Sequence, residues 1–390
     1  KKMEVEGGCD RFPRTVIKHK MGGSRRRKHE ETESTGAAGA KKMEVEEPSQ
    51  KKATDGEPVK PEDATAKDYY FDSYAHFGIH EEMLKDQQRT KGYRNAIMNN
   101  PHCFRDKIVM DVGCGTGILS MFAVKAGAKH VYGIECSGII HTARQIIADN
   151  GLSDKITLIH GKCEEIDLPV DTVDIIISEW MGYALLYESM LDTVLYARDK
   201  WLVKVGGIIM PDVATLYMVG IEDAQYKDEK IHFWDDVYGF DMSCIKKIAI
   251  AEPLVDTVNP EQICTKPTTV MTVNIMTVKK EDLTFEAKWE LIATRNDYLT
   301  ALVLYFDVGF TQIHKPLWIS TGPRAPYTHW RQTVMYLHDQ LSVSKDEAVT
   351  GNMTCKPNPS NHRDLDFEIS YTHDGKASGK VEASHSYRMR

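Results

Sequence analysis

The central part of the chain alternates short apolar runs with longer amphipathic stretches. The short runs are typical of strands buried on both faces, and the stretches between them have helical periodicity. Strand–helix alternation of this kind predicts a parallel, doubly wound sheet. The expected strands are 107–112, 130–135, 156–160, 173–178 and 207–210, and the expected helices are 80–99, 117–126, 137–150 and 190–200.

The pattern changes at Pro211, after which β-branched residues alternate with polar ones. This alternation predicts antiparallel strands of a sandwich or barrel. Residues 223–243 are an exception, because they form a polar, helix-like stretch that carries several aromatic residues. We interpret this stretch as an arm at an interface, with a surface helix folded onto its own barrel as the alternative. The expected strands are 268–278, 285–293, 301–310, 332–337 and 366–371.

The first 66 residues or so are rich in Lys, Glu, Gly, Ser and Thr and contain almost no aromatic residues. Such a composition cannot bury enough apolar surface to order the chain, so we predict a disordered tail. The basic residues 25–28 are typical either of a nuclear-import patch or of a solvated charge run. We therefore predict a tail over 1–66, a first domain over 67–210 and a second domain over 211–390.

The net charge of the 390-residue chain is −8, and it is unevenly spread. The first 60 residues hold 15 of the 49 basic and 11 of the 57 acidic residues, so they carry +4 and the remainder carries −12. An acidic body argues against nucleic acid as the main partner, because phosphate binding needs a basic surface. It is compatible with a cationic partner, which long-range electrostatics would attract.

Several other protein classes are excluded by simple patterns. No run approaches the roughly 18 apolar residues that a membrane helix needs, and we expect no signal peptide and no membrane association. The eight cysteines are scattered without a CxxC pair. This spacing predicts neither a disulfide framework nor a zinc site, and it favours a reducing intracellular compartment.

A glycine-rich motif, D-x-G-x-G-x-G, spans residues 111–117, where the first strand ends and a helix begins. Glycines at Gly113 and Gly115 allow a tight turn and a close approach of the backbone to a ligand. Glu135 follows at the end of the next strand, where an acidic residue accepts hydrogen bonds from ribose hydroxyls. A nucleotide-like cofactor is therefore expected at this edge of the sheet.

The competing motif is the dinucleotide fingerprint G-x-G-x-x-G. Its third glycine would fall on Ile118 or Ser120, so the fingerprint is absent. The observed spacing is instead the form found in methyltransferases that bind S-adenosylmethionine. We predict S-adenosylmethionine as the cofactor and no metal ion.

Two carboxylates follow the fourth expected strand. Glu179 stands at its carboxyl end, where open α/β sheets place their ligand crevice, and Gly182 lets the chain turn so that Glu188 returns nine residues later. Paired carboxylates in a narrow slot suit a planar guanidinium, which offers five donors in a rigid fork. Aromatic residues that would wall this slot are Trp180, Tyr183 and Tyr187.

These residues resemble a known family. The segment 178–183 with Glu188 resembles the double-glutamate loop of the protein arginine N-methyltransferases, and Thr328-His329-Trp330 resembles their second signature loop. The aromatic segment 68–86 also matches. The likeness covers about residue 67 to the C-terminus and is greatest to the type I enzymes. It implies a Rossmann-like methyltransferase domain, an antiparallel β-barrel domain and a helical dimerisation arm at about 223–243.

The resemblance also implies roles for individual cofactor-binding residues. Arg89 would bind the amino-acid carboxylate of the cofactor, and Glu164 would accept from its adenine amino group. The sequence alone does not separate Glu164 from Glu165, and the family pattern favours Glu164. The expected cofactor residues are His80, Arg89, Asp111, Gly113, Gly115, Glu135 and Glu164.

For the reaction, the resemblance implies attack of a guanidino nitrogen on the electrophilic methyl group. Glu179 and Glu188 would hold the guanidinium and draw its charge toward the nitrogens that do not react. His329 paired with Asp86 would either relay the product proton or support the slot. The expected slot residues are Met83, Met190 and Trp330. Met83 and Met190 resemble the methionine pair of the enzymes that make asymmetric dimethylarginine, so we expect mono- and asymmetric dimethylarginine as products.

The expected substrates are Gly/Arg-rich proteins and histones, and the expected assembly is a homodimer, with larger oligomers left open. We expect the protein in the nucleus and the cytoplasm. Two rival functions are a small-molecule methyltransferase and an inactive scaffold for arginine-rich proteins. Cys114 departs from the Ser or Ala that is common in type I enzymes, which suggests the hypothesis of a thiol that senses oxidants.

Overall fold

The computed structural model describes residues 74–390. The predicted tail at 1–66 and the first residues of the aromatic segment, 68–73, lie outside the described residues. The boundaries predicted at residues 66 and 210 remain predictions. The last parallel strand ends at Met210 and the next strand begins at Val213.

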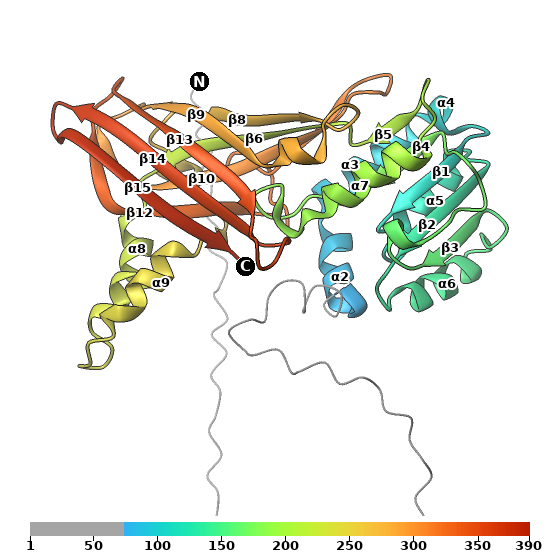
Figure 1. The fold of residues 1–390 in the computed structure, drawn as a ribbon, viewed down its shortest axis with the longest axis horizontal. Helices are drawn as coiled ribbons and strands as arrows, with labels where there is room; N and C mark the ends of the chain where they lie inside the picture. The colour runs from blue at the N-terminus through green and yellow to red at the C-terminus, as the bar shows by residue number, and fades with distance from the viewer. Residues whose placement is uncertain (1–73) are drawn as a thin grey trace, which may run out of the picture. The chain divides into compact units, whose positions relative to one another are not determined.

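The first part of the described chain is built on a five-stranded parallel sheet with the order β3-β2-β1-β4-β5 (Figure 1). Its central strands consist almost entirely of buried β-branched and aliphatic residues, which confirms the predicted parallel sheet. The strands are β1 (Ile108–Val112), β2 (His130–Glu135), β3 (Ile156–His160), β4 (Ile175–Ser178) and β5 (Ile208–Met210). The accompanying helices are α4 (Pro101–Phe104), α5 (Ile118–Lys125), α6 (Ile140–Asp149) and α7 (Met190–Trp201).

The single helix predicted over 80–99 was wrong. The structure has α2 (Phe77–Lys85) and α3 (Gln87–Met98), with Asp86 in an extended conformation between them. The Asp86 side chain accepts a hydrogen bond of 3.0 Å from the backbone N–H of Arg89 and so caps the second helix. The aspartate side chain favours the N-cap position, where it satisfies a free N–H group at the start of a helix. The chain therefore begins a new helix after Asp86 and does not continue α2.

The second part of the described chain consists of two antiparallel sheets. One has the order β7-β12-β10-β6-β8 with β11 paired to β10, and the other has the order β15-β14-β13-β9. This arrangement confirms the predicted antiparallel β domain. The strands are β6 (Val213–Ile221), β7 (Leu254–Asp256), β8 (Thr268–Asn274), β9 (Phe285–Ile292), β10 (Asp297–Phe310), β11 (Leu317–Ser320), β12 (Gln332–Val343), β13 (Ala348–Pro357), β14 (Leu365–Gly375) and β15 (Gly379–Met389).

The continuous helix predicted over 223–243 was also wrong. Helix α8 (Ala224–Lys230) is followed by a 3₁₀ turn at His232–Asp235 and a tight turn in which Tyr238 and Gly239 both have positive φ. A second helix, α9 (Lys246–Ala251), completes the excursion, which projects away from the strands in Figure 1. Phe233, Tyr238 and Phe240 are exposed on it. We call residues 223–251 the arm.

No helix within residues 74–390 is long and apolar enough to cross a membrane.

Candidate functional site

The glycine turn after β1 has a conformation that only glycine adopts easily. Gly113, Gly115 and Gly117 have φ of +72°, +51° and +82°. A Cβ on Gly113 would lie 2.3 Å from the Cε atom of Met190. The turn therefore stays narrow, and its backbone remains open to a ligand where α5 begins.

Glu135 lies directly beside this turn, at the end of β2. Its Oε2 accepts a hydrogen bond of 2.9 Å from the N–H of Gly115, and its Oε1 accepts one of 2.8 Å from the N–H of Ser137. Both contacts fix the carboxylate at the rim of the turn. Each oxygen has a further lone pair, which suits the vicinal hydroxyls of a ribose.

Asp111 lies behind the turn and is fully buried. Its Oδ2 accepts a hydrogen bond of 2.7 Å from Ser120, while its Oδ1 has no hydrogen-bond partner among the described residues. Burial raises the pKa of Asp111 to about 6, although the Ser120 hydrogen bond opposes this shift. Oδ1 of Asp111 is therefore an unsatisfied acceptor buried behind the turn.

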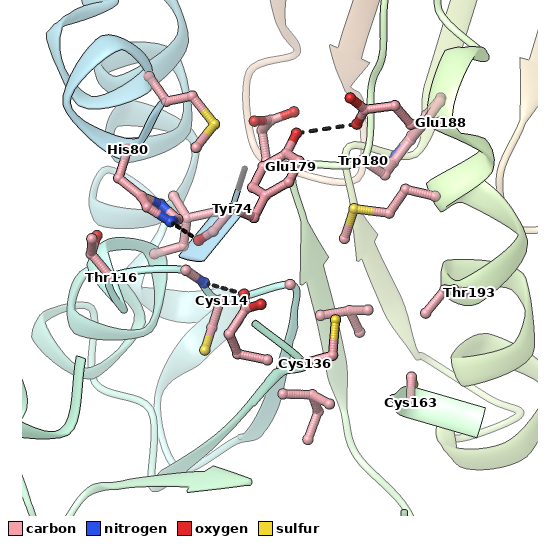
Figure 2. A pocket seen from close by; sticks show the side chains of 18 of the residues that line it. Tyr74, His80, Cys114, Thr116, Cys136, Cys163, Glu179, Trp180, Glu188 and Thr193 are labelled. Atoms are coloured by element: carbon pink, nitrogen blue, oxygen red, sulfur yellow. Dashed lines mark hydrogen bonds between the residues drawn. The ribbon is translucent and has the colours of Figure 1, made fainter. Parts of the chain in front are cut away.

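A cavity of about 200 Å³ joins the glycine turn to residues 179–189. We call these residues the carboxylate loop, because they include Glu179 and Glu188. In Figure 2, Glu179 and Glu188 stand at one end, while Cys114, Cys136 and Cys163 lie toward the other. Three predicted residues, Asp86, Asp111 and Trp330, do not line it. Eleven do: His80, Met83, Arg89, Gly113, Gly115, Glu135, Glu164, Glu179, Glu188, Met190 and His329.

The loop that carries Glu188 is strained. The N–H of Gly182 donates to the carbonyl of Leu185 at 3.0 Å, and Glu188 and Ser189 both adopt left-handed conformations with φ of +73° and +55°. Left-handed non-glycine residues cost on the order of 1–3 kcal/mol each and tend to occur at functional sites.

The environment of Glu188 holds its proton unusually firmly. Burial, the largest effect, raises its pKa to about 7, and nearby Glu179 adds to the rise. A hydrogen bond of 3.1 Å from the Tyr74 hydroxyl to Oε2 and the charge of Arg363 oppose it. A carboxyl with a pKa near neutrality changes its charge in the physiological range, so Glu188 can gain or lose a proton during a reaction.

Glu179, at the end of β4, faces Arg89. Arg89 donates from Nε to Oε2 of Glu179 at 2.9 Å and from Nη1 to the carbonyl of Met83 at 3.3 Å. Both charged side chains are over nine-tenths buried. The expected cofactor role of Arg89 stays a prediction, and in the structure this arginine lines the cavity and pairs with Glu179.

His329 and Asp86 form the expected pair. Nδ1 of His329 lies 2.8 Å from Oδ2 of Asp86, which also accepts from the His329 backbone N–H. Burial alone would raise the pKa of Asp86, but the hydrogen bonds from His329 and Arg89 outweigh it and lower that pKa. Trp330 is buried behind the slot and donates from its indole to the carbonyl of Met181 at 2.8 Å.

Glu164 and Glu165 point to different surroundings. Glu164 lines the cavity and accepts a hydrogen bond of 2.7 Å from Thr193, whereas Glu165 pairs with Lys162 and is mostly exposed. This placement supports the preference for Glu164. Its contact with adenine stays a prediction.

Sequence reasoning missed three residues that contact the predicted ones. Tyr74 donates a hydrogen bond to Glu188, Thr193 donates one to Glu164, and Arg363 contacts the backbone of Glu188 from the loop between β13 and β14. Tyr74 belongs to the aromatic segment that the sequence singles out, so a weak signal existed for it. Arg363 lies 175 positions from Glu188 and carries no such signal.

The cysteine hypothesis finds little physical support. Burial raises the pKa of Cys114 well above its ordinary value, and Asp111 and Glu135 add to that rise. The thiolate is the reactive form of cysteine, so a raised pKa suppresses reaction with oxidants.

Comparison with known proteins identifies the family. A model of the arginine methyltransferase oligomerization subdomain matches residues 212–376, and a model of a methyltransferase domain matches residues 109–206. A protein arginine N-methyltransferase 1 of Chlamydomonas reinhardtii is 64% identical over 328 residues, which are 84% of this chain and 94% of the relative. The chain belongs to the protein arginine N-methyltransferase family.

Two further relatives agree. The protein arginine N-methyltransferase 1 of Schizosaccharomyces pombe is 59% identical over 327 residues, covering 83% of this chain and 96% of that protein. A solved Trypanosoma brucei PRMT1 enzyme-prozyme heterotetrameric complex with AdoHcy has a TM-score of 0.79 and 48% identity, covering 82% of this chain and all of that one. The protein is therefore an S-adenosylmethionine-dependent protein arginine N-methyltransferase, and its oligomerization subdomain supports assembly into oligomers.

The described residues fit this cofactor. The glycine turn leaves backbone open to a ligand, and Glu135 in the same cavity presents acceptors for ribose hydroxyls. Thr193 orients Glu164 in the same cavity.

Proposed function

We propose that Glu179 and Glu188 hold the guanidinium of a substrate arginine at the end of the cavity. The observation that carries this proposal is the convergence of two carboxylates on one slot that is continuous with the glycine turn. High identity to methyltransferase 1 relatives supports type I activity, which gives mono- and asymmetric dimethylarginine. Met83 and Met190 line the same cavity and would limit the room for the methylated nitrogens.

The chemistry divides between cofactor and protein. Bound S-adenosylmethionine supplies an electrophilic methyl group on a sulfonium sulfur. An arginine side chain stays protonated at neutral pH, so its lone pairs are delocalised and it is a weak nucleophile. Glu179 and Glu188 orient the guanidinium and draw positive charge away from the reacting nitrogen. Fixing two reactants in a near-attack geometry lowers a barrier by roughly 7–11 kcal/mol.

After methyl transfer the methylated guanidinium must lose a proton, and a group other than Glu179 and Glu188 is available to accept it. His329 lines the cavity, and its Nδ1 lies 2.8 Å from Oδ2 of Asp86. In our proposal His329 receives the proton after methyl transfer, and Asp86 stabilises the resulting charge. Support of the slot by the same pair is the alternative.

The substrates we propose are Gly/Arg-rich proteins and histone tails. An acidic body attracts cationic segments over a longer range than the slot itself reaches. The decisive experiment is incubation with labelled S-adenosylmethionine and a Gly/Arg-rich peptide, followed by mass-spectrometric fragmentation. Asymmetric dimethylarginine is expected, and symmetric dimethylarginine or an unlabelled peptide would contradict the proposal. The Glu188→Gln variant is the negative control.

The pH dependence should reveal Glu188. A guanidinium pairs with the carboxylate and not with the carboxylic acid, so kcat/KM should fall as the pH drops below about 7. In Tyr74→Phe the hydrogen bond that lowers the pKa of Glu188 is lost. The fall of kcat/KM on the acidic side of the profile, which we call the acidic limb, should therefore move to higher pH. Measured kcat/KM profiles of both proteins test this. A limb that stays in place or moves to lower pH would contradict the assignment.

The arm should govern assembly, and we propose a homodimer. Phe233, Tyr238 and Phe240 together expose an apolar surface that a folded monomer would leave in water. The double variant Tyr238→Asp/Phe240→Asp should shift the mass measured by light scattering from a dimer to a monomer at micromolar concentration. Val205 is also highly exposed but lies outside the arm, so Val205→Asp is the matched control and should stay dimeric. A dimeric double variant would contradict the role of the arm.

A further inference from the structure

The loop between β13 and β14 is held together by hydrogen bonds from its own side chains. Asn358, Asn361 and Asp364 are all at least 96% buried. Oδ1 of Asn358 accepts from the N–H groups of Ser360 and Asn361, and the Asn361 side chain donates to Asp364 at 2.8 Å. These bonds make residues 358–364, which we call the clamp loop, a rigid projection of the second domain.

The clamp loop contacts the carboxylate loop at two consecutive residues. The N–H of Glu188 donates to the carbonyl of Arg363 at 2.9 Å, and Nη1 of Arg363 donates to the carbonyl of Glu188 at 2.5 Å. The next residue, Ser189, donates from its hydroxyl to the carbonyl of His362 at 2.6 Å. A fourth contact joins His362 to Asp192 in α7, also at 2.6 Å.

These contacts fall on the strained part of the carboxylate loop. Glu188 and Ser189 both have positive φ, a conformation that an L-residue leaves unless its surroundings hold it. Both backbone polar groups of Glu188 are bonded to Arg363. A reciprocal pair of this kind fixes the peptide planes on either side of the Glu188 Cα atom, and therefore the direction in which the carboxylate points.

We propose that Arg363 is a positioning residue, which holds Glu188 in its left-handed conformation and thereby aims its carboxylate at the substrate guanidinium. This inference rests on the proposed role of Glu188. It adds a requirement from the second domain, since the clamp loop belongs to the sheet of β13 and β14 and not to the cofactor domain.

Arg363 also acts through its charge. The guanidinium lines the cavity and lowers the pKa of Glu188 against the larger effect of burial. Three other groups face this carboxylate from neighbouring elements. Tyr74 donates a hydrogen bond to it, Glu179 at the end of β4 repels it, and Tyr187 precedes it in the same loop. The Arg363 side chain therefore affects Glu188 in two ways that can be separated: its hydrogen bond holds the Glu188 backbone, and its positive charge lowers the pKa of the Glu188 carboxyl.

Two substitutions separate these contributions. Arg363→Lys keeps the charge but lacks the planar fork, so kcat should fall by about 10- to 100-fold while the acidic limb of kcat/KM stays in place. Arg363→Gln keeps a donor but removes the charge, so the acidic limb should also move to higher pH. Cofactor binding, measured by calorimetry with S-adenosylhomocysteine, should remain within a few-fold of wild type in both variants.

Lys380→Met is the matched control. Lys380 lies on β15 and pairs with the exposed Glu382 at 2.7 Å, so its loss removes a cation from the same sheet without touching the clamp loop or the carboxylate loop. Its kcat and pH profile should equal those of wild type.

The proposal is overturned when both Arg363 variants keep the wild-type kcat and acidic limb, or when they lose thermal stability with no change in either. Failure of the proposed function would give a different experimental result. In that case the wild-type protein itself would transfer no label to the Gly/Arg-rich peptide.

Discussion

The Glu188→Gln variant should transfer methyl groups about 10²- to 10³-fold more slowly than wild type, the scale seen when a preorganised electrostatic contact is removed from an active site. Glutamine has the same shape as glutamate and still accepts the Tyr74 hydrogen bond, so the loop should keep its conformation. The substitution removes only the negative charge that pairs with the guanidinium. Single-turnover transfer of labelled methyl groups to the peptide measures the effect.

Glu368→Gln provides the comparison for this variant. Glu368 lies on β14, is exposed and has a lysine 3.7 Å away, so it resembles Glu188 in charge but not in place. We expect its transfer rate to equal that of wild type. A Glu188→Gln rate within threefold of wild type would show that the carboxylate does not act on the reacting arginine.

The second large effect is expected from Gly182→Ala. A Cβ at this position would lie 2.0 Å from the carbonyl oxygen and 2.7 Å from the carbonyl carbon of Tyr187. These are backbone atoms, so the collision cannot be relieved by a rotamer change. The carboxylate loop must therefore open, and Glu188, which directly follows Tyr187, must move with it. A displacement of about 1 Å in a reacting group costs on the order of 10²-fold in rate, so kcat should fall by at least that factor.

Binding of the cofactor should survive this substitution, because the glycine turn and Glu135 are on other strands. Calorimetric titration with S-adenosylhomocysteine measures it. Gly151→Ala controls for the loss of a glycine as such, since Gly151 has a positive φ of +67° and nothing within 4 Å of the added Cβ. Equal kcat in Gly182→Ala and Gly151→Ala would contradict the steric argument.

The residues that sequence reasoning placed well are those set by local order along the chain. Glu135 is the last residue of β2 and Glu179 directly follows β4, and parallel strands in a doubly wound sheet bring their carboxyl ends to the same edge. The strand alternation was readable because buried parallel strands are apolar throughout. The five predicted parallel strands therefore lie within two residues of those in the structure.

The residues that sequence reasoning missed depend on tertiary contacts. Tyr74 meets Glu188 across 114 positions, and the Arg363 guanidinium meets the same residue across 175. No hydrophobic or polar periodicity in the sequence indicates either contact. The strand β6 was missed for a related reason, because it is buried along nearly its whole length and shows no alternation.

The aspartate that separates α2 from α3 illustrates a third case. Asp86 was predicted as a partner of His329, and the structure brings the two together. The same side chain caps α3 through its other oxygen. Its contact with His329 and the helix break therefore involve one side chain, and a helical pattern alone does not reveal either of them.

The contacts of His329, Trp330 and Arg363 with the first half of the chain limit how this protein can be divided. A fragment that ends at Met210 would keep all five parallel strands and the glycine turn, but it would lose the groups that hold Asp86, Met181 and Glu188. Such a fragment would keep Glu179 and Glu188 but would lose the contacts that hold Glu188 and Asp86 in place. Recombination at this boundary would therefore separate the two carboxylates from the residues that orient them.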